Sequence, residues 1–513
     1  MAARKSFLLF LANIFGSGLG FIATYVVAHR MGAEALGTIG YVMGLTGITA
    51  FISNVGFSQA HFRYAAGQKD IGDLVSTYGV IITILTLIQI LALATMPWAT
   101  RWLGNAWLNT QEEWILYVTF SIGLLLTSGT RLFSVTHQAQ EAAAKVSLAL
   151  ALGSLTVAIA QIGVAVAGLG VVALGIAYQV EPAVKLLVLW LTSKGMPYGR
   201  PRRSIVVRYT RYTAPIALRS MLNGIYGNVD KIQLQQLGGT QQVGFYTGNL
   251  GTAAAINRIS MATMRIFFPR TVADVEQGQL TSARRRLNTV LRYLLLLVIP
   301  MIAIVAAYSH LIVRLTLGPD FLPSASTLSV LAIQAVVQMI AMPYTNMILA
   351  LEKHAYLIPA SLLSVGILVL GNTFLIPTEI FGLPAAGLGS TGAAMALTLA
   401  AVGSLAMQMG VTARFAKIGF PISLLWFAIG GGVMFAILRI PSLGGGDVTL
   451  LQIPPLITIG IVAFVGLMLL THQLSTSELR LFVQAINPVH MIRYVHAELN
   501  SSTEESNSHT PVA

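Results

Sequence analysis

Charged side chains inside long apolar stretches are the residues of this chain whose chemistry most needs an explanation. A charge at the depth of a lipid bilayer costs several kcal/mol unless it is hydrated or paired. Two acids, Glu181 and Asp230, lie well inside such stretches. The basic residues found there are Arg131, Lys185, Arg219, Lys231, Arg258, Arg265, Arg292 and Arg439.

Arg219 and Arg258 are the strongest candidates for a binding site. Neither has an acid three or four residues away that could pair with it on one helix face. We therefore expect both to face a hydrated cavity, where a phosphate or diphosphate would match the guanidinium bidentately. The alternative is that each caps the carbonyl groups of a broken helix or pairs with a distant acid. Lys231 and Arg265 are further candidates for substrate binding.

The two acids are candidates for coupling transport to an ion or proton. Asp230 and Lys231 are adjacent, so they point in different directions and cannot simply pair with each other. Glu181 and Lys185 are four residues apart, which is the spacing of a self-neutralising pair on one helix face. Structural pairing is therefore the alternative for Glu181.

The elements that carry these charges are predicted to be transmembrane helices. Hydrophobic residues make up 55% of the 513 residues and charged residues only 10%, whereas soluble domains carry about 25% charged residues. A span needs roughly twenty apolar residues. The stretches that qualify are 7–28, 36–60, 76–97, 114–134, 146–166, 171–192, 212–236, 243–267, 289–313, 325–350, 355–376, 386–412, 421–440 and 449–471. We predict an all-α polytopic membrane protein with about fourteen spans.

Basic residues in the connecting segments predict the orientation. With the N-terminus in the cytoplasm, the inner segments hold twenty Lys and Arg residues, and the outer segments hold only Arg30, Arg101 and Arg314. This bias follows the positive-inside rule. It predicts a multi-pass protein of the cytoplasmic membrane with both termini cytoplasmic. The net charge of +13 then reflects contact with membrane lipids and not with nucleic acid.

An internal repeat predicts the domain organisation. Two Gly-x-x-x-x-Gly turns, Gly32 to Gly37 and Gly239 to Gly244, follow the first and seventh spans and are 207 residues apart. Recurrence of short glycine turns by chance is the alternative. The repeat predicts two six-helix lobes related by an axis along the membrane normal. The predicted parts are an N-terminal lobe (1–192), a basic linker (193–211) with a short interfacial helix at 204–212, a C-terminal lobe (212–412), two further spans (413–471), and an amphipathic segment with a disordered tail (472–513).

No motif of an enzyme stands out. The chain has no cysteine, so disulfides and cysteine metal sites are excluded. It also lacks a phosphate-cradling Gly-x-x-x-x-Gly-Lys-Ser/Thr loop, a cluster of metal ligands and a convincing nucleophile motif. We therefore expect no enzymatic activity, no metal and no cofactor.

Four groups of residues resemble a known family. They are the first hairpin (28–37), the stretch Asn228–Leu234 with Leu237-Gly238 and Val243–Tyr246, the loop 317–321 with 330–333, and Leu351-Glu352-Lys353 with 387–394. In this order and spacing they resemble polysaccharide exporters of the multidrug/oligosaccharidyl-lipid/polysaccharide superfamily. The first two spans depart from the lipid II flippases of that superfamily, because their cations Arg30 and Arg63 lie at the span ends.

The resemblance implies two six-helix lobes around a central cavity, alternating access, and a polyprenyl-(di)phosphate-linked glycan as the substrate. Cationic residues of the cavity, here Arg219 and Arg258, would receive the phosphate. The expected function is a flippase for lipid-linked oligosaccharide or polysaccharide repeat units, working alongside glycosyltransferases or a polymerase of the same pathway. The alternatives are a cation-coupled multidrug exporter of the same superfamily and a non-transporting scaffold for glycan synthesis.

Overall fold

The computed structural model describes residues 2–68, 70–102, 104, 107–443, 451–475 and 478. Within these ranges the side chains of 2–12, 14, 54, 215, 252–266 and 441–443 fall outside the description. The predicted amphipathic segment and tail after residue 478 also lie outside the described residues.

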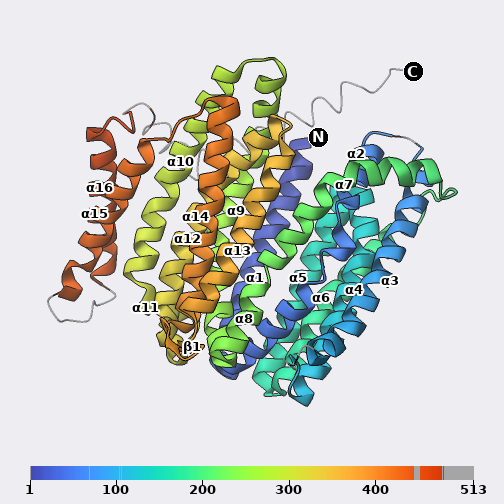
Figure 1. Ribbon diagram of the computed structural model, residues 1–513, viewed down its shortest axis with the longest axis horizontal. Coiled ribbons are helices and arrows are strands. Elements are labelled where there is room, and N and C mark those ends of the chain that lie inside the picture. The colour runs from blue at the N-terminus through green and yellow to red at the C-terminus, as the bar shows by residue number, and fades with distance from the viewer. Residues whose placement is uncertain are drawn as a thin grey trace, which may run out of the picture.

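The described chain is almost entirely helical (Figure 1). The helices of the first half are α1 (Ala2–Gly47), α2 (Phe57–Ala65), α3 (Gly72–Trp102), α4 (Gln111–Ala139), α5 (Ala143–Ala167), α6 (Gly170–Thr192), α7 (Arg203–Tyr226) and α8 (Val229–Gly238). Those of the second half are α9 (Thr240–Glu276), α10 (Leu280–Ala307), α11 (Ser309–Thr316), α12 (Ala325–Ala350), α13 (Leu357–Leu375), α14 (Gly389–Ala416), α15 (Ser423–Leu443) and α16 (Ile453–Leu470). Short 3-10 helices cover Ile52–Asn54, Pro319–Ser324 and His354–Tyr356, and a two-stranded hairpin pairs β1 (Glu379–Ile380) with β2 (Leu383–Pro384).

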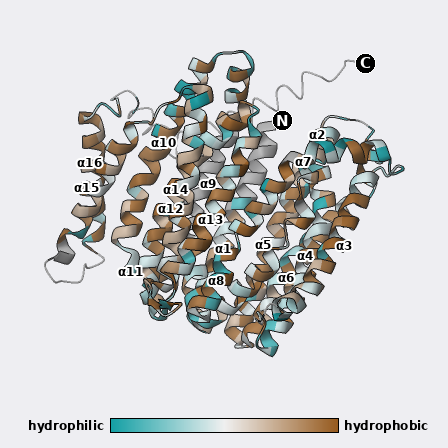
Figure 2. Ribbon diagram, in the orientation of Figure 1, coloured by the Kyte–Doolittle hydropathy of each residue, from teal (hydrophilic) through white to brown (hydrophobic). Residues whose placement is uncertain are grey.

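The class of polytopic membrane protein is confirmed. Ten helices of the described chain are long and apolar enough to cross a membrane. The other four predicted spans fall on α1, on α7 with α8, and on α9. Figure 2 shows hydrophobic residues along the helices and hydrophilic residues gathered at many of their ends.

Several predicted boundaries were wrong. The span 36–60 ends as an α-helix at Gly47, and residues 52–65 form a 3-10 turn and the separate helix α2. The spans 212–236 and 289–313 are each broken, near Gly227 and at Tyr308. The expected interfacial helix at 204–212 is not separate, because α7 begins at Arg203 and continues through it. Apolar composition alone cannot locate such breaks, because the residues on both sides remain compatible with a helix.

The helices pack as two groups that meet on one side of the molecule. Helix α1 packs on α5, and α5 on α6, while α12 packs on α9 and α14, and α14 on α13. We call α1–α6 the N-terminal group and α9–α14 the C-terminal group. One buried core is shared by both groups, and its residues, among them Leu36, Tyr41, Tyr246 and Phe321, lie near the predicted outer loops. The remaining large cores belong to one side or the other.

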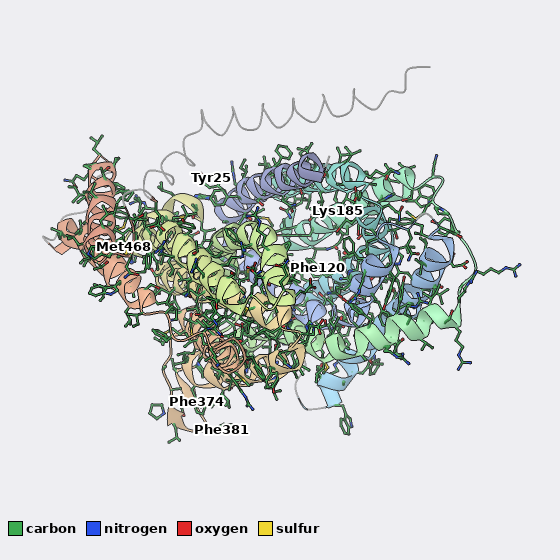
Figure 3. All side chains as sticks on the ribbon, turned by 90° about the horizontal axis from the view of Figure 1, so that it is seen from above. Tyr25, Phe120, Lys185, Phe374, Phe381 and Met468 are labelled. Carbon is green, nitrogen blue, oxygen red and sulfur yellow. The ribbon has the colours of Figure 1, made fainter. Side chains whose placement is uncertain are left out.

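Helix α7 crosses from one group to the other. Its contacts include α2 and α3 of the N-terminal group and α13 of the C-terminal group. Figure 1 shows it running diagonally from α2 toward α8. The last two helices, α15 and α16, pack beside α10 at one end of the molecule. Met468 of α16 marks this end in Figure 3.

The two predicted glycine turns adopt the same backbone conformation. Gly32 has φ 74° and ψ −173°, and Gly239 has φ 85° and ψ 171°. Glycine tolerates such a positive φ because it has no Cβ. The two turns thus share one backbone conformation at positions 207 residues apart, and the repeat of whole lobes stays a prediction.

The second glycine of each turn lies where the two groups touch. A Cβ on Gly37 would overlap the carbonyl oxygen of Thr240, and a Cβ on Gly244 would overlap the carbonyl oxygen of Ala33. The two contacts are reciprocal, as expected at a pseudo-twofold axis. Gly40, Gly44 and Gly47 continue the same face of α1 against α8 and α9. We call this contact the outer seam.

A buried aromatic cluster fastens α2 to the beginning of α7. The His61 ring stacks on Tyr78 with centroids 4.2 Å apart, and its two nitrogens bond the hydroxyl groups of Tyr209 (3.0 Å) and Thr136 (2.9 Å). His61 is fully buried. Burial lowers the pKa of His61 from 6.5 to about 4, so His61 is neutral at neutral pH.

This histidine predicts a pH dependence of stability. The unfolded chain takes up a proton at His61 near pH 6.5, and the folded chain does so only near pH 4. The stabilisation is therefore complete above pH 6.5 and declines by about 3 kcal/mol as the pH falls to 4. Thermal melting in detergent should show this decline in the wild type and a flatter profile in H61Q. The exposed His354 gives a control, because H354Q should keep the wild-type slope; equal slopes in H61Q and wild type would contradict the prediction.

Candidate functional site

Arg219 lies in the second half of α7 and has no partner of opposite charge among the described residues. It follows Arg203 by sixteen residues, which places it about 24 Å along the helix from its start. Its Nε atom is buried without a hydrogen-bond partner. The residue as a whole is half-buried. A buried N–H group of a guanidinium that lacks a partner is costly unless a ligand or water completes it.

Arg219 lines a cavity of about 550 Å³ between α7 and the C-terminal group. The wall on α7 continues with Asn223 and Tyr226. The facing wall carries amides and hydroxyls from three helices, with Gln338, Thr345 and Asn346 on α12, Ser361 and Ser364 on α13, and Ser404 and Gln408 on α14. Among the described residues that line the cavity there is no Asp or Glu. The described lining therefore combines one cation with neutral hydrogen-bonding groups and a few apolar side chains such as Met339 and Met342. A cation beside neutral donors and acceptors suits an anion attached to a polar molecule.

Part of this wall is already ordered by its own hydrogen bonds. The Thr345 hydroxyl donates to Oε1 of Gln408 at 2.6 Å, and Nε2 of Gln408 donates to the Ser404 hydroxyl at 3.2 Å. The first bond joins α12 to α14 across the cavity wall, and the second orders the Gln408 side chain within α14. The wall is thereby fixed in place, which lowers the cost of ordering it around a ligand.

Asp230 and Lys231 lie apart from this cavity lining, on α8 after the break in the seventh predicted span. The Asp230 side chain is buried and accepts a hydrogen bond from the Tyr246 hydroxyl of α9 at 2.6 Å. Lys231 donates from Nζ to the carbonyl oxygen of Gly227 at 3.2 Å. Lys231 thus caps the end of α7, where a cation is favourable, and is not among the residues that line the cavity.

The remaining candidates lie elsewhere. Lys185 forms an ion pair with Glu181, the structural alternative for that acid. Residues 258 and 265 belong to helix α9, but the side chains of Arg258 and Arg265 lie outside the described residues. Their predicted roles remain predictions.

The polar face of α12, α13 and α14 was missed by reasoning from single charges. Its members are spaced three or four residues apart: Ser361 with Ser364, and Ser404 with Gln408. On α7, Arg219, Asn223 and Tyr226 follow the same spacing. This wall could have been predicted from neutral polar residues that recur every three or four positions inside apolar spans.

Within the described part of the chain, no group of three His, Asp or Glu residues is placed to hold a metal ion. The cavity wall thus has the means to bind and orient an anionic, polar molecule through one guanidinium and several neutral donors and acceptors.

Comparison with known proteins identifies the family. The family described as "Polysaccharide biosynthesis protein" matches residues 26–326, more than half of the chain. The chain belongs to this family. The predicted resemblance to polysaccharide exporters is thereby confirmed.

Two archaeal relatives of this family member are similar over long stretches. A protein named as a probable low-salt glycan biosynthesis flippase, Agl15 of Haloferax volcanii, is 22% identical over 91% of this chain and 94% of its own length. An uncharacterized membrane protein of Methanocaldococcus jannaschii is 21% identical over 50% of this chain. That match spans 63% of the M. jannaschii protein, less than two thirds of its length.

This chain shares its fold with the solved structure of a lipid flippase. The lipid II flippase MurJ, in an inward closed conformation, aligns over 91% of this chain and 99% of its own with a TM-score of 0.70 and 14% identity. Identity at this level shows the fold and not the substrate.

Proposed function

We propose that the protein is a flippase that moves polyprenyl-(di)phosphate-linked oligosaccharide or polysaccharide repeat units across the cytoplasmic membrane, without making or breaking bonds in them. The observation that carries the proposal is the guanidinium of Arg219, whose buried Nε has no hydrogen-bond partner, in a cavity whose described lining adds neutral hydrogen-bonding and apolar groups. Family membership and the glycan flippase name of the H. volcanii relative support it.

In this mechanism Arg219 receives the phosphate of the lipid carrier. The Ser, Thr, Asn and Gln side chains of α12–α14 match the hydroxyl groups of a sugar in hydrogen-bonding capacity. The prenyl chain stays in the membrane because transfer of its apolar surface to water is unfavourable. Arg258 of α9 is proposed as the second cation.

Movement follows from the way the two helix groups meet. We propose that residues 1–192 and 212–412 act as two lobes and that both termini lie in the cytoplasm. The shared core and the outer seam join the groups near the predicted outer loops. Rocking about this contact would expose the cavity alternately to the two sides.

A cation-coupled drug exporter is the second candidate, and the cavity argues against it. A cationic drug would meet the positive charge of Arg219, and the described part of the lining offers it no carboxylate. Like charges at close range disfavour binding.

Reconstituted vesicles distinguish the candidates. Vesicles holding the purified full chain receive a fluorescent lipid-diphosphate oligosaccharide, and its appearance in the opposite leaflet is measured by a membrane-impermeant quencher. A flippase moves this lipid faster than protein-free vesicles do. Accumulation of a cationic dye without movement of the glycan lipid would favour the drug exporter, and movement of neither would favour the scaffold.

Asp230 is our candidate for the group that couples transport to a proton gradient. A carboxylate that takes up and releases one proton would couple transport to a pH gradient, and one pH unit corresponds to about tenfold accumulation per proton. D230N keeps an oxygen that can accept from the Tyr246 hydroxyl, so the variant should fold. We expect gradient-driven stimulation of transport in wild-type vesicles and its loss in D230N, with transport down a concentration gradient retained. A gradient response in D230N equal to that of the wild type would remove Asp230 as the coupling group. The control is Y246F, which removes the hydrogen bond but keeps the carboxylate and should retain the gradient response.

A further inference from the structure

A second cavity, of about 640 Å³, lies between α2 and the beginning of α7. Its walls carry Arg63 and Tyr64 from α2, and Arg208, Arg211 and Tyr212 from α7, with Ser204 and Val207. Three guanidinium groups thus face one space, and none of the described residues that line it carries a carboxylate. None of these residues belongs to the cavity that contains Arg219.

The positive charge of this second cavity is not neutralised by the described part of the chain. None of the three arginines forms an ion pair among the described residues. Asp73 at the start of α3 is occupied elsewhere, because it pairs with Arg202 and accepts a hydrogen bond from the backbone N–H of Arg200 at 2.8 Å. The three guanidinium groups therefore remain available to an external anion.

Aromatic rings hold two of the guanidinium groups in place. Arg63 lies 5.2 Å from the centre of the Tyr212 ring, and Arg208 lies 5.6 Å from the centre of the Tyr64 ring. Tyr64 stacks on Tyr209, which bonds the buried His61. A guanidinium stacked on a ring keeps its N–H edge free to bind an oxyanion, and its fixed position lowers the cost of binding.

The surroundings indicate that the anion is carried by a lipid. Phe62 on α2 is 46% exposed and Val207 on α7 is 51% exposed, so apolar side chains lie beside the charged cavity. Arg63 and Arg208 stand in segments predicted to be cytoplasmic, where anionic headgroups attract basic residues. A soluble anion would gain nothing from the exposed apolar groups, whereas a lipid would cover them.

We infer that this cavity is a binding site for the phosphate headgroup of an anionic phospholipid, held by Arg63, Arg208 and Arg211. The site is independent of the proposed substrate, and it would stand if the cavity at Arg219 bound something else. Arg211 and Arg219 are eight residues apart on α7, about 12 Å along the helix. A lipid bound here would hold the beginning of this helix against α2.

Native mass spectrometry of the detergent-solubilised full chain, titrated with phosphatidylglycerol, tests the inference. Each arginine near the membrane surface contributes about a fivefold change in affinity. The triple variant R63Q/R208Q/R211Q should therefore weaken the tightest phosphatidylglycerol site on the order of a hundredfold. The control R200Q/R270Q/R285Q removes the same charge from exposed positions outside the cavity and should stay within about threefold of the wild type.

Further titrations identify which molecule carries the bound phosphate. Neutral phosphatidylcholine should show no site that depends on these arginines, and inorganic phosphate in millimolar excess should not displace phosphatidylglycerol. The single variant R208Q, whose side chain is exposed, should weaken binding about fivefold and covers the case in which the triple variant fails to fold. Equal phosphatidylglycerol affinity in the wild type, R208Q and the triple variant would overturn the inference. Dependence on these arginines only for a prenyl phosphate, or displacement by inorganic phosphate, would overturn the assignment to a phospholipid.

Discussion

Replacing Arg219 with methionine is expected to reduce export of the lipid-linked glycan by at least about thirtyfold and to raise the melting temperature of the protein. Removing one partner of a buried, hydrogen-bonded charge pair costs at least about 2 kcal/mol of binding, which corresponds to thirtyfold. In the free protein the Arg219 Nε has no partner, so methionine of similar length removes a desolvation cost. A gain near 1 kcal/mol would raise the melting temperature by about 2 °C.

The two opposite effects distinguish a ligand site from a structural arginine. A structural arginine would lose stability together with activity, whereas a residue kept for a ligand loses activity alone. Export is measured in cells that depend on this protein, and melting is measured on the purified chain. R270M removes an equal charge from the exposed inner end of α9 and should leave both quantities unchanged. A destabilised R219M, or one that exports normally, would contradict the assignment.

A disulfide across the outer seam is expected to abolish transport until it is reduced. A Cβ on Gly40 would lie 3.1 Å from Cβ of Thr247, slightly closer than the usual separation of about 3.8 Å in disulfides. The double variant G40C/T247C should therefore form a bond between α1 and α9 with a small shift. Because the native chain has no cysteine, no background variant is needed. If the two groups must rock about this seam, the oxidised protein is held in one state, and a reductant restores its activity.

A matched pair within one group provides the control. A Cβ on Gly371 of α13 would lie 2.9 Å from Cβ of Ala396 of α14. G371C/A396C thus tests an equally close bond that does not join the two groups, and transport should stay within about twofold in both redox states. Normal transport by oxidised G40C/T247C, with the crosslink verified by its gel mobility, would show that the seam does not move.

The fold class was predictable because membrane insertion imposes strong rules on sequence. Backbone N–H and C=O groups in lipid must form hydrogen bonds within helices. Apolar stretches such as 146–166 and 171–192 therefore correspond closely to α5 and α6. The glycine turns at Gly32 and Gly239 could also be predicted, because each has the pattern Gly-x-x-x-x-Gly between two apolar stretches, and both glycines adopt a positive φ. The breaks at Gly227 and Tyr308 were not, because they depend on the helices packed around them.

The candidate site was predictable only in part. Arg219 stands out in the sequence because a lone cation in an apolar stretch is expensive. Lys231 is likewise a cation within a predicted span, but it caps the end of α7. This role depends on the break in the helix. The neutral wall made by Gln338, Thr345 and Gln408 carries no charge, and the three-dimensional packing of α12 and α14 is what brings it opposite Arg219.

The most direct test of the central claim is the affinity of the purified protein for a prenyl-diphosphate oligosaccharide, compared with an analogue in which a neutral linker replaces the diphosphate. If the guanidinium of Arg219 receives the phosphate, the wild type should bind the diphosphate at least about thirtyfold more tightly than the analogue, and R219M should bind the two almost equally. A wild-type protein with no preference for the diphosphate, or an R219M variant that keeps the full preference, would contradict the claim.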